Sequence, residues 1–171
     1  MARPTPTNSR YDIKPNDFIV SKTDLKGKIT YCNQIFMQLA KYSEGELIGA
    51  PHNIIRHPDM PRIVYKLLWS RIQNKEEIFA YVKNLSNDGG YYWVYANVTP
   101  SLDANGNLIG YYSVRRKPSE KGIKACEDLY AKLLNEESRG GMDASGKYLK
   151  NLLEDKGVSY DEFVVSLQEE I

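Results

Sequence analysis

The first third of the chain alternates between short apolar runs and polar turns. Residues 17–23 and 28–31 are each rich in apolar and β-branched side chains, which is typical of strands. The residues between them end at Gly27, and a glycine at that position supplies the positive φ that a tight turn often requires. The pattern therefore predicts a two-stranded hairpin.

Two capping patterns follow the hairpin. Asn33 precedes an apolar-periodic segment, so we expect it to be the N-cap of a helix over residues 34–41. Ser43 and Glu46 have the spacing of a capping box, and Gly49 ends the short helical turn that they predict.

A proline-rich segment separates these short helices from a longer one. Three prolines within residues 51–61 exclude a long helix there. Asp59 lies two residues before Pro61, so we expect Asp59 to cap a helix that begins near Pro61 and ends near Asn74. The apolar positions of this helix recur at intervals of three and four and predict one buried face: Ile63, Val64, Leu67, Leu68 and Ile72.

Three longer strands come next. Residues 78–85, 91–99 and 108–116 read as strands, and the glycine-containing turns at 86–90 and 103–106 join them as a meander. Two strands, two short helical segments, one longer helix and a three-stranded meander predict an α+β domain with a five-stranded antiparallel sheet and short helices on one face.

The composition divides the chain into three parts. Residues 1–16 carry three prolines among polar residues, which indicates a flexible N-terminal lead-in. Residues 17–118 form the sheet domain, and Pro118 marks its end. From residue 119 to residue 171 helix-forming residues dominate, so we expect a helical C-terminal extension, broken at Gly140-Gly141 and again at Gly157.

Charge and length exclude several classes of protein. The 171 residues carry 23 Lys and Arg against 22 Asp and Glu, a net charge of +1, which argues against a broad nucleic-acid-binding face. No run approaches the ~20 apolar residues that cross a bilayer, and no signal peptide is present, so we expect a cytoplasmic protein without membrane insertion. Neither a catalytic constellation nor a metal-ligand spacing occurs, so we expect no enzymatic activity.

One face of the meander carries small side chains. Ile78, Ala80, Val82 and Asn84 alternate along one strand, and Val94, Ala96 and Val98 alternate along its partner. Small residues that face short helices can leave a cavity, and Asn84 would add a hydrogen-bond donor and acceptor to it. The alternative is that larger helix residues fill the space. The opposite face carries aromatic side chains that predict a contact with a partner, with the C-terminal helices or with a second copy: Phe79, Tyr81, Tyr91, Trp93 and Tyr95.

Several motifs resemble one known family. They are the segments 23–25 (TDL), Asn33 with Phe36, Tyr42 with 46–47 (EL) and Gly49, 51–53 (PHN), 56–61 (RHPDMP), Trp69, 82–84 (VKN), 92–94 (YWV) with 96–97 (AN), and 110–115 (GYYSVR). Together they make residues 17–118 similar to a PAS domain. More narrowly, the PHN and RHPDMP runs resemble the flavin-binding PAS domains of the bacterial aerotaxis receptors, and a chain of this size resembles the free-standing PAS component of two-part energy-taxis systems.

The resemblance implies a ligand, a site and a partner. It implies FAD as the cofactor, redox or energy state as the signal, and a separate membrane-bound chemotaxis transducer as the partner. Carried over residue by residue, the flavin-site set comprises Asn33, Arg56, His57, Asp59 and Asn84, with Trp69 near the pocket on the long helix. A homodimer is a further arrangement that the sequence leaves open.

Two departures and two alternatives accompany this resemblance. The receptors have a tryptophan shortly before the pocket strand, where this chain has Ile78, and the cysteine of light-sensing flavin PAS domains is absent from residues 52–55. The first alternative is a haem b oxygen sensor with His57 or His52 as the axial ligand, and the second is an unliganded interaction module. Whether Arg115 faces the pocket or the solvent stays open; a pocket-facing Arg115 would need an anionic partner.

Overall fold

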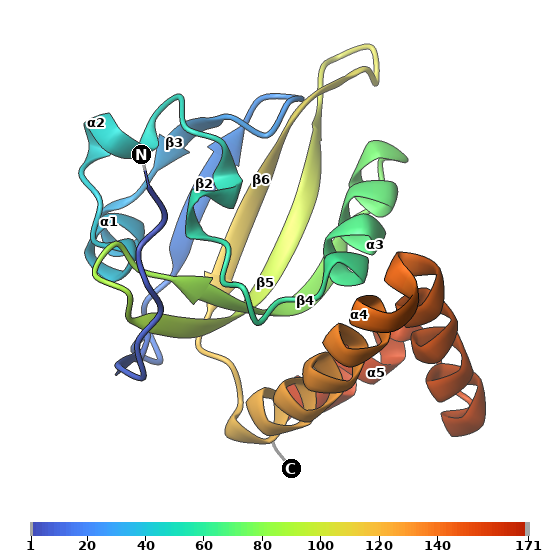
Figure 1. Ribbon diagram of the computed structural model, residues 1–171. Coiled ribbons are helices and arrows are strands. Elements are labelled where there is room, and N and C mark those ends of the chain that lie inside the picture. Colours follow the sequence, from blue (N-terminus) through green and yellow to red (C-terminus); the bar gives the residue numbers. More distant parts are fainter. Residues whose placement is uncertain (1, 170–171) are drawn as a thin grey trace.

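The structure is a computed structural model, and it describes residues 2–169. One curved sheet forms its centre, short helices lie at one end of it, and the C-terminal helices pack beside it (Figure 1). In chain order the elements are β1 (Arg10–Tyr11), β2 (Ile19–Thr23), β3 (Ile29–Cys32), α1 (Gln34–Ala40), α2 (Glu44–Leu47), the 3₁₀ helix η1 (His52–Ile55), α3 (Arg62–Gln73), β4 (Ile78–Leu85), β5 (Tyr91–Leu102), β6 (Leu108–Arg116), α4 (Glu120–Lys156) and α5 (Tyr160–Gln168).

The predicted hairpin and both capping patterns are confirmed. Gly27 has a φ of 82° in the turn between β2 and β3. The Asn33 side chain caps α1 by accepting from the Phe36 amide, and Ser43 and Glu46 form the capping box of α2. These signals are reliable because each cap joins residues only three apart in the chain.

The sheet has six strands and is mixed. The five expected strands pair antiparallel, as predicted, and their spatial order is β3-β2-β6-β5-β4. Within the segment expected to be a flexible lead-in, Arg10 and Tyr11 form β1, which pairs in parallel with the start of β5. The expectation of a purely antiparallel five-stranded sheet is therefore corrected: β6 ends at Arg116 opposite Tyr95, which leaves the first residues of β5 open to β1.

Helix α3 begins where it was expected, but its cap was wrongly assigned. Asp59 does not cap it, because the helix starts at Arg62 and no side chain near in sequence accepts from its first amides. Instead the buried carboxylate of Glu137, on α4, accepts from the amides of Arg62 and Ile63 at 2.9 and 3.0 Å. Ser145 donates to the same carboxylate at 2.9 Å. The C-terminal extension thus supplies the N-terminal cap of the longest helix in the sheet domain.

The C-terminal extension is helical, with both predicted breaks. Helix α4 kinks at Gly141, whose φ of 68° and ψ of −160° are not helical, and it ends at Gly157 in the left-handed region. Figure 1 shows the chain reversing direction within α4, with α5 beside it. Helix α5 ends at Gln168, and Glu169 after it has an extended backbone.

The C-terminal helices cover the aromatic face of the meander. Trp93 stacks on Tyr130 of α4 with ring centroids 6.1 Å apart, and the Tyr130 hydroxyl donates to the Tyr81 carbonyl at 2.7 Å. The Tyr81 hydroxyl in turn donates to the Gln168 side chain at 2.6 Å. Gly122 allows this approach, because a Cβ there would collide with the Tyr81 ring. Of the three occupants expected for this face, the structure shows the C-terminal helices.

Candidate functional site

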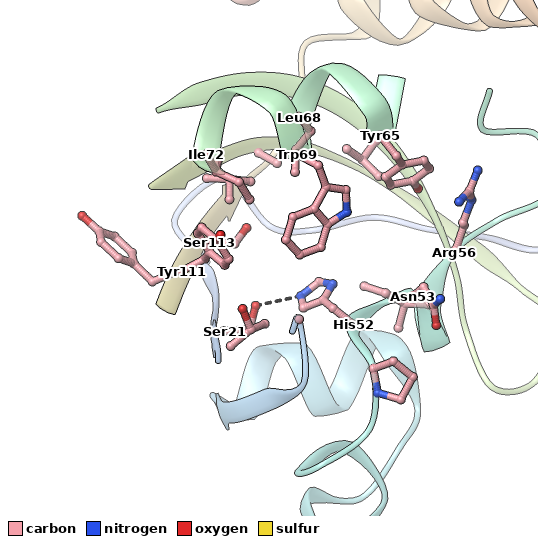
Figure 2. A pocket seen from close by; sticks show the side chains of 18 of the residues that line it. Ser21, His52, Asn53, Arg56, Tyr65, Leu68, Trp69, Ile72, Tyr111 and Ser113 are labelled. Carbon is pink, nitrogen blue, oxygen red and sulfur yellow. Dashed lines mark hydrogen bonds between the residues drawn. The ribbon is translucent and has the colours of Figure 1, made fainter. Parts of the chain in front are cut away.

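A cavity of about 230 Å³ lies between the sheet and the helices η1 and α3. Strands β2, β4, β5 and β6 form its floor, and Figure 2 shows η1 and α3 approaching it from two sides. Most of the exposed surface of its walls is apolar, and a few polar side chains converge on it. This combination is typical of a small-molecule site.

Small side chains of the meander form the floor, as the alternation predicted. Val82 of β4 and Ala96 and Val98 of β5 line the cavity, and Asn84 lies at the end of the same row. Ile78, Ala80 and Val94 share this face but do not line the cavity; Ile78 packs with Ile72 in a separate cluster instead. Of the two alternatives that the sequence left open for this face, a cavity or a filled core, the structure shows a cavity.

Helix α3 supplies the opposite wall. Tyr65, Leu68, Trp69 and Ile72 lie at intervals of three and four on one helix face, and all four line the cavity. The Trp69 ring meets Tyr111 of β6 edge to face, with centroids 5.5 Å apart. In the view of Figure 2 the Trp69 indole lies between α3 and the His52 ring, and both side chains line the cavity. An aromatic surface therefore faces the cavity even though Ile78 stands where the family resemblance leads us to expect tryptophan.

Arg56 and Asn84 meet at one end of the cavity. Their backbones pair in an isolated antiparallel bridge, which attaches the end of η1 to β4. Asn84 is buried, whereas Arg56 is partly exposed and its guanidinium lies 4.1 Å from the centroid of the Tyr65 ring. Arg56 therefore offers a cation at the open end of the cavity, and Asn84 offers an amide inside it.

A buried polar cluster occupies the sheet side of the cavity. Arg115 Nη1 donates to Nε2 of His52 at 3.0 Å, Arg115 Nη2 donates to the Ser21 hydroxyl at 2.9 Å, and Ser21 Oγ lies 3.0 Å from the same His52 nitrogen. Because a guanidinium can only donate, His52 Nε2 must be the unprotonated acceptor, and the ring proton resides on Nδ1. The guanidinium also lies 4.6 Å from the centroid of the Phe36 ring.

The pKa values of both titratable groups in this cluster, Arg115 and His52, are lowered. Burial lowers the pKa of Arg115 to about 10, and the nearby Tyr92 hydroxyl opposes that shift. Burial and the Arg115 charge together lower the pKa of His52 to about 3, so the imidazole is neutral at physiological pH. Among residues 2–169, no carboxylate pairs with Arg115, and neither its Nε–H nor the Tyr92 hydroxyl has a hydrogen-bond partner.

Three of the residues carried over from the family lie outside the cavity. Asn33 caps α1 and also binds the backbone of β2, accepting from the Val20 amide at 3.0 Å. His57 is buried next to the cavity wall, where its Nδ1 accepts from the Asp59 amide at 3.0 Å. The Asp59 carboxylate pairs with Lys83 at 2.7 Å near the surface. These three residues shape the segments around the cavity, and any role in ligand binding stays a prediction.

Ser21, His52 and Arg115 were the residues that motif reasoning assigned weakly or missed. Strand register carries the signal that could have found two of them. Arg115 pairs with Ala96, and Ser21 pairs with Ser113 of the same β6 face. Because Ala96 faces the cavity and paired residues share a face, Arg115 faces it too. Arg115 thus faces the pocket and not the solvent, which the sequence alone had left open.

The described part of the chain offers neither a metal site nor a membrane span. Within residues 2–169, no group of three or more His, Cys, Asp or Glu side chains is placed to hold a metal ion. In the same range, no helix is at once long enough and apolar enough to cross a bilayer.

Comparison with known proteins adds the family to this geometry. The sequence profile described as the PAS fold matches residues 29–115. The chain belongs to the PAS-fold family. It is 36% identical over 132 residues to the aerotaxis receptor of Escherichia coli K12, covering 77% of this chain and 26% of the receptor. It is 29% identical over 97 residues to the nitrogen fixation regulatory protein of Klebsiella pneumoniae, covering 57% of this chain and 20% of that protein.

Solved PAS structures share the fold. A PAS domain from Colwellia psychrerythraea superposes with a TM-score of 0.54 at 24% identity, covering 58% of this chain and 85% of that one. A light-oxygen-voltage domain studied with a flavin analogue superposes with a TM-score of 0.57 at 24% identity, covering 71% and 86%. The chain spans about a quarter of the length of the aerotaxis receptor.

Proposed function

We propose that this chain is a sensory PAS protein whose cavity binds FAD and that it reports redox or energy state to a membrane-bound chemotaxis transducer. The observation that carries the proposal is the cavity itself, with apolar walls and a buried cation that lacks a counter-charge. The aerotaxis receptor, a relative at 36% identity, directs attention to energy taxis. A flavin is the subject of one structural neighbour, the light-oxygen-voltage domain.

The residues of the cavity fit the flavin. A flavin ring is flat and aromatic, with apolar faces and an edge of carbonyl and nitrogen acceptors. Val82, Ala96 and Val98 leave room on the sheet side, and Trp69 offers an aromatic surface on the helix side. The Asn84 amide is a donor that such an acceptor edge needs, and the Arg115 guanidinium adds positive charge at the same wall of the cavity.

Arg56 suits the diphosphate of FAD. It lines the open end of the cavity, and a guanidinium binds phosphate oxygens through two parallel hydrogen bonds. Arg3 lies beside it, donating to the Arg56 carbonyl at 3.0 Å, and no described carboxylate is paired with either side chain. Together the two arginines supply positive charge next to the opening.

The C-terminal extension offers a route from the cavity to a partner. A bound flavin would supply reversible electron uptake, and the chain's own residues would respond to it. Helix α3 forms a wall of the cavity, and its N-terminus is held by Glu137 of α4. At its other end Arg71 pairs with Asp161 of α5 at 2.9 Å. A shift of α3 would therefore act on both C-terminal helices, which we propose as the contact with the transducer.

The geometry gives the haem alternative less support. Nε2 of His52 already accepts from Arg115, which removes that lone pair from iron ligation. His57 does not line the cavity, and its Nδ1 accepts from the Asp59 amide. The receptor and regulator among the relatives fit a signalling role; the absence of enzymatic activity, the cytoplasmic location and a homodimer stay predictions.

The test is a visible absorption spectrum of the purified, untagged protein, followed by heat release and chromatography of any cofactor. We expect the two-banded blue absorption of a flavin, bleaching with dithionite, and released FAD. A Soret band would support haem instead, and colourless protein that takes up no FAD on refolding would contradict the proposal.

A matched pair of variants locates the site. Val98→Phe places a larger side chain inside the cavity, whereas Val114→Phe makes the same change on the neighbouring strand, on the opposite face of the sheet. We expect the FAD-to-protein ratio to fall at least tenfold in Val98→Phe and to stay unchanged in Val114→Phe. Equal FAD content in both variants would place the flavin elsewhere.

A further inference from the structure

The positive charge of Arg115 has no counterpart within the described protein. The side chain is 3% exposed, and its hydrogen-bond acceptors are a neutral imidazole and a hydroxyl. A buried ion without a partner is strongly unfavourable, because water no longer solvates it and no opposite charge replaces the water. The fold nevertheless places this charge at the wall of a cavity rather than against a carboxylate.

The cluster also holds the guanidinium in one orientation. Ser21 accepts a hydrogen bond from Nη2, His52 accepts one from Nη1, and the Phe36 ring lies against the guanidinium face. The donor without a protein partner is the Nε–H. An arginine fixed at both of its terminal nitrogens is preorganised, so its side chain loses little conformational entropy when a ligand binds.

We infer that Arg115 is the counter-cation for negative charge on the bound flavin, and that it makes the cavity bind the reduced, anionic flavin more tightly than the oxidised, neutral ring. This inference rests on the proposed function. Ser21 and His52 are positioning residues, since they hold the guanidinium and do not carry charge. His52 stays neutral here, so the cluster presents a single positive charge.

The charge balance of the redox step explains the preference. Oxidised flavin takes up two electrons and one proton from a two-electron donor, and the reduced ring therefore carries one negative charge more than the oxidised ring. A cation next to the ring stabilises that added charge, most strongly where water is excluded. The buried charge is thus unpaired in the oxidised state and paired in the reduced state, which raises the midpoint potential.

The test is a spectroelectrochemical titration of FAD-loaded variants. Arg115→Gln keeps hydrogen-bond donors but removes the charge, and Arg115→Lys keeps the charge. Arg116→Gln is the matched control, because Arg116 is the next residue, is exposed and faces the other side of the sheet. The readouts are the midpoint potential and the thermal stabilisation that oxidised and reduced FAD each confer.

In Arg115→Gln we expect the preference for reduced over oxidised flavin to fall at least tenfold, which lowers the midpoint potential by about 30 mV or more. Arg115→Lys should lose less than threefold, about 15 mV, and Arg116→Gln should match the wild type. If Arg115→Gln is insoluble, Arg115→Met carries the same expectation, since an apolar residue removes the buried charge altogether.

Each remaining outcome decides the question. An Arg115→Gln potential equal to that of the wild type overturns the inference and leaves the proposed function standing. Equal shifts, or equal loss of FAD, in Arg115→Gln and Arg115→Lys also overturn it, because charge would then not be the determinant. Wild-type protein that binds no FAD overturns the proposed function itself, and the inference with it.

Discussion

The same strands of the meander carry two different faces, one packed against helices and one that lines a cavity. On the outer face of β4 and β5, large aromatic side chains meet the C-terminal helices, and their hydroxyl groups find partners: Tyr81 with Gln168, and Tyr130 with the Tyr81 carbonyl. On the inner face the side chains are small and a cavity remains, and two buried polar groups have no hydrogen-bond partner among residues 2–169: the Arg115 Nε–H and the Tyr92 hydroxyl.

The difference separates packing from binding. Native cores keep few voids and few unsatisfied polar groups, so a face that has both departs from what stability alone favours. On the outer face the aromatic rings pack against the C-terminal helices and their hydroxyl groups are hydrogen-bonded, so this face is a packing contact between the sheet domain and the extension. The inner face has both a cavity and buried polar groups without partners among the described residues, which is the physical reason to assign it to a ligand.

Removing the outer aromatic anchor should have the largest effect on stability. Trp93→Ala deletes a buried ring that stacks on Tyr130, and we expect the free energy of unfolding to fall by about 3–5 kcal/mol. Urea denaturation followed by circular dichroism measures it. Tyr112→Ala, which removes an exposed aromatic from the uncovered part of the same sheet, should cost under about 1 kcal/mol. Comparable losses in the two variants would show that the C-terminal helices are not docked on this face.

The second-largest effect on stability is expected at the N-terminal cap of α3, which Glu137 of α4 supplies. Glu137→Gln replaces a carboxylate that accepts from two α3 amides and from Ser145, and one amide oxygen cannot serve all three donors. We expect a loss of about 1–3 kcal/mol, measured by the same denaturation. Glu127→Gln, an exposed change on the same helix, is the control and should be nearly neutral. A neutral Glu137→Gln would mean that the cap does not contribute to coupling α3 with the extension.

The buried histidine of the cavity predicts a pH effect. The ring lies among protein groups, with Arg115, Ser21 and Phe36 around it, and its pKa falls from 6.5 to about 3 on folding. Below pH 6.5 the unfolded chain therefore binds a proton that the folded chain refuses, so stability decreases as pH falls from 6.5 toward 3. His52 should contribute up to about 1.4 kcal/mol per pH unit in that window.

Denaturation at pH 7 and pH 5 tests this contribution. Between these two values the wild type should lose more stability than His52→Gln does. The variant should keep part of the pH dependence, because burial and Lys83 also lower the pKa of His57. Identical pH dependence in wild type and His52→Gln would contradict the assignment of a neutral imidazole beside Arg115.

The smallest stability effect is expected at the two asparagines that the family resemblance placed in one set. Asn33→Ala removes a helix cap outside the cavity and should cost about 1 kcal/mol without changing FAD content. Asn84→Ala removes an amide from the cavity wall and should lower FAD content at least tenfold. Cofactor analysis after heat release separates the two. Loss of FAD in Asn33→Ala with retention in Asn84→Ala would reverse the assignment.

Much of the fold was readable from the sequence because its signals are local. The caps of α1 and α2, the glycine turn after β2, the long strands of the meander and the breaks at Gly141 and Gly157 each depend on residues a few positions apart. The small-residue face that becomes the cavity floor was also readable, because alternation along a strand determines which side chains share a face.

Tertiary structure alone decided which groups meet. Glu137 caps a helix that begins 75 residues earlier in the chain, β1 adds a parallel strand to a meander that was expected to be purely antiparallel, and Arg115 reaches His52 across 63 residues. No spacing in the sequence encodes these contacts, because they depend on strand register and on how helices pack on the sheet. The sequence determined the elements and the faces of this protein; packing determined which charge was left without a partner, because only the assembled fold removes water from Arg115 without placing a carboxylate beside it.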